Sequence, residues 1–301
     1  MAELNYVTQF WPRIIEMYGH LLMSNELYNT NQDIQIINTK DIRLPKITVS
    51  GYRDHNRKTL SFNTGSYGND FETKTLDHDR DIEFAIDPMD VDETNQIVSL
   101  ANIQSRFEKT QAIPELDCYT FSKLYTEAKR VGAKISNTAI TTANILSDFD
   151  ANIEAMEEAG VPLERVIMYC TPAFKTKLKN AEGIQRTLEV SGSAKNIDRR
   201  VRSLDDISTI KTAPASRLKT AFDFTEGFQV ASAGKQINYI IIDPEAQVSR
   251  VKYSYIKAFT PGHDSRTADK YLYQNRRFNG TFALLDDLLE QGCIINAEAE
   301  G

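Results

Sequence analysis

The chain has 301 residues, of which 41% are hydrophobic and 26% are charged, an ordinary balance for a globular protein of one elaborated domain or two smaller ones. Its net charge of −7 argues against a broad nucleic-acid-binding face. Three widely separated cysteines match no metal-binding spacing and suit a reducing compartment, and no apolar run approaches the ~20 residues that span a bilayer. We therefore expect no membrane contact, and no pattern indicates a cofactor.

The N-terminal segment, residues 5–28, predicts an amphipathic helix. Trp11, Ile15, Tyr18 and Leu22 recur at helical spacing on one stripe. Such a helix either docks on the core of its own subunit or serves as an arm that packs on a neighbouring subunit or an assembly partner.

Residues 33–86 predict a long β-arm. Two extended segments, 33–49 and 71–86, flank a polar, glycine-containing stretch that carries the basic residues Arg53, Arg57 and Lys58. A lone two-stranded ribbon is marginally stable in water, so this arm needs another surface to lie on. A second copy of the chain could supply that surface.

The stretch from Phe71 to Val131 predicts one long strand, an acidic corner and a long helix. The strand alternates with period two, so that Asp77, Asp79, Asp81 and Glu83 share one face. The helix begins near Asp92, is interrupted at Pro114 and resumes to Val131. Its predicted core stripe consists of Ile97, Ala101, Phe107, Leu116 and Leu124.

The acidic strand invites a metal-site interpretation, which the spacing does not support. Asp77, Asp79 and Asp81 match the first three ligand positions of an EF-hand, but Ile82 stands where glycine is needed and Pro88 where glutamate is needed. Alternate residues of a straight strand also hold their carboxylates ~7 Å apart. A solvated or interface-facing acidic stripe is the favoured interpretation.

No catalytic pattern emerges from the remaining reactive residues. No serine lies in a glycine elbow, and Cys170 ends an apolar strand, where a core thiol is the favoured interpretation over a nucleophile. The basic run of Arg199, Arg200 and Arg202 lacks interleaved aromatic residues, which favours a solvated or inter-subunit face over nucleic-acid contact.

The charged clusters instead suggest contacts between identical subunits. Patches of opposite sign on one chain meet heterologously, which builds rings or shells rather than closed dimers. The candidate inter-subunit contacts are Arg53, Arg57, Lys58, Asp77, Asp79, Asp81, Glu83, Arg199, Arg200 and Arg202.

Beyond Val131 the sequence predicts alternating helices and strands. A helix is expected over 144–159, a buried strand over 165–169 and a helix that starts at Thr171-Pro172. Residues 181–235 are rich in loop signals. A core strand over 238–242 and two long strands over 248–259 and 271–285 complete the prediction.

Two blocks of the sequence resemble the major capsid proteins of tailed bacteriophages. The first is LDHDRDIEFAIDPMDVDET, followed after a helical stretch by IPELDCYTFSKL; the second is NRRFNGTFALLDD with a final GCII. The matching central positions are Leu76, Asp79, Arg80, Phe84, Asp87, Met89, Asp90, Glu93, Phe107, Pro114, Glu115, Asp117, Tyr119, Ser122 and Lys123.

The resemblance implies an α+β protein of the Hong Kong 97-type capsid fold. It divides the chain into an N-terminal arm (1–32), an extended hairpin called the E-loop (33–92) and a peripheral domain with a long spine helix (93–135). An axial domain (136–245) follows, and residues 246–301 comprise the return strands of the peripheral domain and the C-terminus. The E-loop would then lie on the spine of the adjacent subunit.

The resemblance also implies a structural, non-enzymatic role in the virion. The chain would assemble with itself, as hexamers and pentamers, into an icosahedral shell around double-stranded DNA, which it contacts non-specifically. Expected partners are the portal and other head proteins and, since no helical scaffolding segment precedes the β-arm, a separate scaffolding protein; assembly would occur in the bacterial cytoplasm. The alternatives are an encapsulin-like nanocompartment shell and a metal-dependent enzyme that uses the acidic strand.

Overall fold

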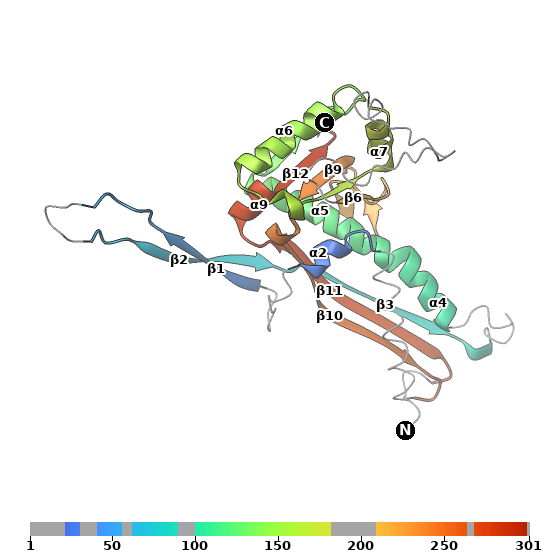
Figure 1. Cartoon of the computed structure of the whole chain (residues 1–301). Helices are drawn as coiled ribbons and strands as arrows, with labels where there is room; N and C mark the ends of the chain where they lie inside the picture. Colours follow the sequence, from blue (N-terminus) through green and yellow to red (C-terminus); the bar gives the residue numbers. More distant parts are fainter. Residues whose placement is uncertain are drawn as a thin grey trace, which may run out of the picture.

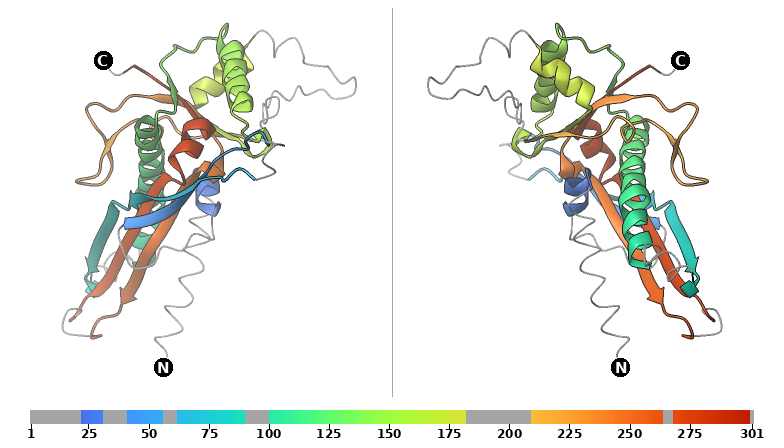
Figure 2. Two further views of the ribbon diagram at one scale, coloured as in Figure 1. Left: turned by 90° about the vertical axis from the view of Figure 1, so that its left-hand side faces the viewer. Right: turned by 90° about the vertical axis from the view of Figure 1, so that its right-hand side faces the viewer.

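A projecting β-ribbon, a long helix on a narrow sheet and a compact upper domain make up the chain (Figure 1). The computed structural model describes residues 22–30, 41–55, 62–89, 100–181, 209–263 and 268–299. The upper domain lies at one end of the long helix, and the narrow sheet runs along the other end (Figures 1 and 2).

The ribbon consists of β1 (Asp41–Val49) and β2 (Tyr67–Thr75), which pair antiparallel as an isolated two-stranded sheet. The predicted β-arm is therefore present, but the single strand expected over 71–86 is wrong. The chain leaves the ribbon at Thr75 and starts a new strand, β3 (His78–Ile86), in a different sheet. Leu76, only 1% exposed, lies at the break and packs in a cluster with Val248 and Phe282. Burial of this one side chain accompanies the change of direction.

The narrow sheet has the antiparallel order β10 (Gln247–Phe259), β11 (Tyr271–Ala283), β3. In β3 the even positions are buried or half-buried and the odd positions are exposed, as the period-two pattern predicted. One sheet face is covered by the spine, which we define as the helical run from Leu100 to Val131 (Figures 1 and 2).

The spine is continuous through its proline. It comprises α4 (Leu100–Phe107), a π-helical turn η1 (Glu108–Ala112) and α5 (Ile113–Val131). The Ile113 N–H bonds to the carbonyl oxygen of Glu108, five residues back, directly before Pro114. Proline lacks an N–H and its ring clashes with a carbonyl of the preceding turn, and the wider π turn accommodates that clash. The interruption that the sequence suggested at Pro114 is therefore a local bulge, and the helix does not break.

The upper domain is built on a five-stranded sheet with the order β4, β12, β9, β5, β6. These strands span Lys134–Ser136, Cys293–Ala297, Ile237–Ile242, Ile167–Cys170 and Thr209–Thr212 respectively. Both faces of the sheet are buried, because alternate residues of β9 enter different cores. Ile240 and Ile242 pack with α5, whereas Tyr239 and Ile241 pack with α6 (Ile145–Glu158) and α7 (Pro172–Lys179).

Shorter elements connect these parts. They are α2 (Asn25–Asn29), η2 (Leu163–Arg165), β7 (Phe222–Asp223), β8 (Gln229–Val230), η3 (Pro244–Ala246) and α9 (Asp286–Gly292). The predicted start of α7 is confirmed by its cap, since the Thr171 side chain accepts a bond from the Phe174 N–H at 3.2 Å. No helix among the described residues is long and apolar enough to cross a bilayer.

Two of the expected domain limits do not follow the sheets. Strand β3, expected in the E-loop, belongs to the three-stranded sheet, and strand β12, expected in the peripheral domain, lies between β4 and β9 in the upper sheet. Both assignments depend on pairing between segments far apart in the chain, which the order of elements along the sequence does not reveal.

Candidate inter-subunit surfaces

The distal ribbon exposes large apolar side chains. Ile47 is 71% exposed, Val49 76%, Tyr67 85% and Phe71 55%, and Tyr52 and Phe62 in the connecting loop are almost fully exposed. Clusters of this kind on a protein surface usually mark an interaction site. The ribbon pairs with no third strand among the described residues, and its distal part projects away from the body of the subunit (Figure 1).

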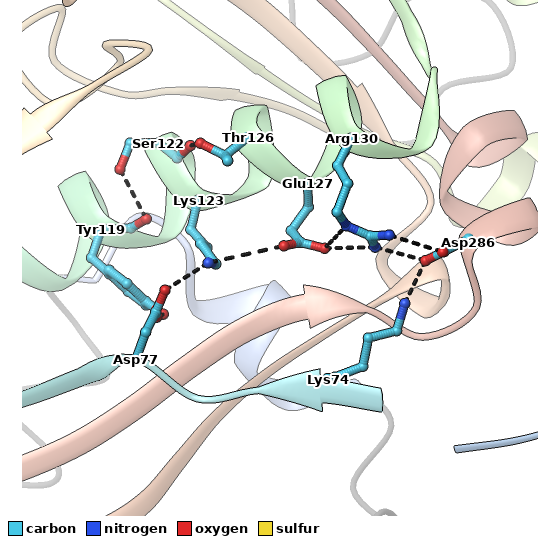
Figure 3. A network of polar contacts seen from close by, with 9 residues as sticks. All are labelled: Lys74, Asp77, Tyr119, Ser122, Lys123, Thr126, Glu127, Arg130 and Asp286. Atoms are coloured by element: carbon cyan, nitrogen blue, oxygen red, sulfur yellow. Dashed lines mark hydrogen bonds and ion pairs between the residues drawn. The ribbon is translucent and has the colours of Figure 1, made fainter. Parts of the chain in front are cut away.

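The root of the ribbon, in contrast, is held by a network of ion pairs (Figure 3). Asp286 of α9 receives Lys74 of β2 and both terminal nitrogens of Arg130, at 2.6 and 2.9 Å. Glu127 links Arg130 to Lys123, which bonds to Asp77 at 2.6 Å. The chain just before and just after Leu76 is thus tied to the side of α5.

The charges of this network stabilise the ionised carboxylates. The Arg130 guanidinium, with Lys74, holds the pKa of Asp286 well below its usual range. For Asp77, partial burial opposes ionisation, but hydrogen bonds from Lys123 and Tyr119 still hold the pKa below its usual value.

Three residues of the predicted acidic stripe, Asp79, Asp81 and Glu83, lie on the sheet face that points away from the spine. The prediction is wrong for Asp77, which precedes β3, turns toward the spine and accepts bonds from Lys123 and Tyr119. Asp79 forms a two-pronged pair with Arg276, at 2.6 and 3.0 Å, and Glu83 accepts a bond from Gln274 at 2.6 Å. Asp81 lies across from Arg276 in the strand register. Their role as contacts between subunits remains a prediction, with the intrachain bonds as competing partners.

The predicted basic contacts are only partly within the described residues. Arg53 is exposed in the ribbon loop, where its carbonyl oxygen accepts a bond from Asn63 at 3.3 Å. The other basic candidates lie outside the described residues: Arg57, Lys58, Arg199, Arg200 and Arg202.

The residues of the predicted spine core also differ in outcome. Leu116 and Leu124 are buried, at 2% and 1% exposure, and the half-buried Phe107 ring lies 5.5 Å from that of Phe84. The prediction is wrong for Ala101, which is exposed, because the spine covers the sheet mainly through α5 and only a short part of α4 reaches it. Ile97 lies outside the described residues.

Two buried charges were not recognised in the sequence. Glu108 of the π turn, 1% exposed, accepts bonds from Arg277 at 2.7 and 2.8 Å and from Asn275 at 2.8 Å. Asp117, fully buried, accepts the Ser24 N–H at 3.0 Å and pairs with Arg217 at 2.8 Å. Both partners lie far away in the chain, so no local spacing could have revealed them.

The chemistry sought in the sequence is not assembled by the described residues. They contain no group of histidines, cysteines and carboxylates that could hold a metal ion. Cys170 is buried, and burial raises the pKa of its thiol to about 11, which fits a core thiol.

Comparison with known proteins finds a similar fold in structures from bacteriophages. No family model and no curated protein matches the sequence. The structure is similar to the asymmetric unit of the bacteriophage PhiM1 mature capsid (TM-score 0.64, 13% identity, covering 87% of this chain and 83% of that one) and to the capsid of cyanophage P-SCSP1u (0.58, 13%, 88% and 85%). A structure from Mycobacterium phage Che8 also matches (0.56, 9%, 86% and 85%). The chain therefore has the Hong Kong 97-type fold of tailed-phage capsid proteins.

Proposed function

We propose that this chain is the major capsid subunit of a tailed bacteriophage and builds a closed icosahedral shell around double-stranded DNA. The observation that carries the proposal is the ribbon. It projects from the body, exposes apolar side chains at its distal end and has a charged root tied to the subunit by Asp286. A surface of this kind is stable only when another molecule covers it.

The role requires no reaction chemistry. A shell is held by many repeated contacts, each of which can be weak, since a single exposed ion pair contributes roughly 0–1 kcal/mol. Heterologous contacts, in which the ribbon of one copy meets a different surface of the next, close into rings of five or six when the rotation between copies permits it.

The proposal includes partners that the fold family implies. A scaffolding protein would set the curvature, a portal would occupy one vertex, and packaged DNA would touch the inner surface without sequence preference. The particles would assemble in the bacterial cytoplasm and persist as the virion head.

Electron microscopy of the purified full chain tests the proposal. We expect closed icosahedral particles when the chain is produced together with the head proteins encoded beside it, and nuclease-protected double-stranded DNA in particles from infected cells. A chain that remains monomeric under both conditions contradicts a shell role. Particles that carry protein cargo and no DNA contradict the phage-head role and favour a nanocompartment.

Shortening the ribbon tests which part of the chain joins the subunits. Val49 and Tyr67 lie opposite each other, so residues 50–66 can be replaced by an Asn-Gly turn without disturbing the register. We expect a folded subunit that forms no stable shells. A wild-type yield of particles would show that the loop is dispensable.

A further inference from the structure

Strand β3 forms a free edge of the three-stranded sheet. It pairs with β11 over its whole length, from His78 to Ile86, and no described strand pairs with its other side. Both views of Figure 2 show β3, in teal, at the outer margin of this sheet. A free edge presents unpaired N–H and carbonyl groups to any extended chain that lies beside it.

The other outer strands of the body carry features that usually prevent strand addition. In β10 the register shifts between Val251 and Tyr253, and the outer strands of the upper sheet, β4 and β6, have only three and four residues. Bulges and short strands are both devices that block pairing at an edge. Strand β3 has nine residues, no proline and no register shift in its pairing with β11.

Among the described residues only one end of the β3 edge is covered by a turn. The Arg80 guanidinium donates to the carbonyl oxygens of Phe224 and Gly227, which holds the turn between β7 and β8 against this end. The same guanidinium pairs with Glu115 of the spine at 2.8 Å. The edge from Asp81 onward is therefore the part that remains open to an added strand.

A cleft of ≈ 550 Å³ opens along this edge, between the sheet and the spine. Ile82, Phe84 and Phe107 line its apolar part, and all three are only half-buried. Asn279 also lines the cleft; it is 4% exposed, and its side-chain oxygen accepts no hydrogen bond from the described residues. Buried polar groups rarely lack a partner, and mixed walls around a space of this size are typical of binding sites.

The alternation of β3 specifies the chemistry of a strand that would fit beside it. Asp81 and Glu83 are exposed on the outer face of the sheet, whereas Ile82 and Phe84 line the cleft. Side chains directly opposite each other on adjacent strands interact, and opposite charges or apolar pairs are favourable there. The complementary strand therefore alternates a basic residue with an apolar one.

This chain does not itself supply such a strand. Its sequence has no stretch of five residues in which lysine or arginine alternates strictly with an apolar residue. The nearest approach, from Arg250 to Tyr253, is four residues long and already lies within β10. The net charge of −7 also favours a basic partner over a second copy of the chain.

We propose that the free edge of β3 binds an extended segment of another protein, in which basic and apolar residues alternate, as a fourth strand of the sheet. The main chain of the segment bonds to the edge from Asp81 to Ile86, and its apolar side chains enter the cleft. Its basic side chains lie beside Asp81 and Glu83. The inference does not depend on the shell function, because the edge and the cleft belong to a single subunit.

Synthetic peptides test this binding on unassembled subunits. The probe is a fluorescently labelled, end-blocked peptide of sequence KVKVKVK. The controls are EVEVEVE, with the opposite charge, and KKVVVKK, with the same composition but no alternation. We expect saturable binding of the probe by fluorescence anisotropy and only weak binding of the controls, because the probe alone places valines in the cleft and lysines beside the acids. Equal binding of KKVVVKK overturns the inference, since it would reflect general attraction to an acidic protein.

Charge reversal on β3 locates the site. Asp81→Lys with Glu83→Lys changes two exposed side chains, and the preference for KVKVKVK over EVEVEVE is expected to fall by at least about tenfold, because two cross-strand charge pairs change sign. Glu154→Lys with Glu157→Lys makes the same change of net charge on exposed positions of α6 and is expected to leave the preference almost unchanged. An equal fall in both variants overturns the inference. Asp81→Lys alone replaces the double variant if the latter does not fold.

Hydrogen exchange distinguishes this edge from the ribbon, whose two strands also have free edges. Bound KVKVKVK is expected to slow exchange of the β3 amides. Protection confined to β1 or β2, or an absence of peptide binding, contradicts strand addition at β3. Failure of the chain to form particles contradicts only the shell function, so the two proposals are tested separately.

Discussion

The upper sheet and the ribbon show opposite ways of using β-strands. Strand β9 in the upper sheet is buried on both sides, and its isoleucines enter two separate cores. Within the described residues, strands β1 and β2 have no sheet neighbour beyond each other, and the large apolar side chains Ile47, Val49, Tyr67 and Phe71 are exposed. The upper sheet is therefore packed on both sides within one subunit, whereas the described part of the subunit leaves the distal ribbon uncovered.

The largest expected difference between these regions is in the free energy of unfolding of the isolated subunit. Ile240→Ala removes a fully buried side chain from β9 and is expected to cost about 2–5 kcal/mol. The same change at Ile47, on the ribbon, is expected to stay within about 0.5 kcal/mol. Urea denaturation of unassembled subunits measures both values. A cost at Ile47 comparable to that at Ile240 would mean that the ribbon is packed within its own subunit.

The root of the ribbon is expected to show an intermediate effect. A Cβ atom on Gly280 would lie 1.7 Å from a terminal carbon of the buried Leu76, so Gly280→Ala must displace that side chain. Overpacking of this kind costs about 1–3 kcal/mol. Gly51→Ala is the matched control in the ribbon loop, because its Cβ meets nothing within 4 Å. Equal stability of the two variants, measured by denaturation, would show that Leu76 does not pack as described.

Acidic pH is expected to weaken the ion pairs that hold the root of the ribbon against its own subunit. The folded-state pKa of Asp286 is depressed, so its ionic stabilisation is present above the ordinary carboxyl pKa of about 4 and is lost as the pH falls below that value. Hydrogen exchange of the β2 amides should therefore speed up below about pH 4, beyond the intrinsic change. In the Asp286→Asn variant, exchange of the β2 amides should already be faster at neutral pH. The additional acceleration below about pH 4 should then disappear. An unchanged profile in the variant would assign the acid response to another group.

The smallest expected effect is at the outer sheet face. The pair between Asp79 and Arg276 is largely exposed, so Asp79→Ala is expected to change subunit stability by no more than about 1 kcal/mol. The contribution of this ion pair to assembly is measured separately, from the yield of particles as a function of salt concentration. A large loss of subunit stability would show that the acidic stripe serves the fold of its own chain.

Local pattern was sufficient for the elements that depend on neighbouring residues. The cap at Thr171, the helix that follows Asn144, the alternation of β3 and the two long C-terminal strands follow from spacing, propensity and turn chemistry. The acids of β3 could be assigned to one face for the same reason, since side chains alternate along any strand.

Only the tertiary structure decided how these elements combine. The break at Leu76, the position of β12 in the upper sheet and the partners of Glu108 and Asp117 all depend on residues distant in the chain. The bases that meet the acidic stripe, Arg276 and Lys123, are likewise remote from it in sequence. Sequence periodicity reports which side of an element is apolar, because that property is local. Which other element covers that side is set by long-range packing, and no described part of the same subunit covers the exposed apolar side chains of the ribbon.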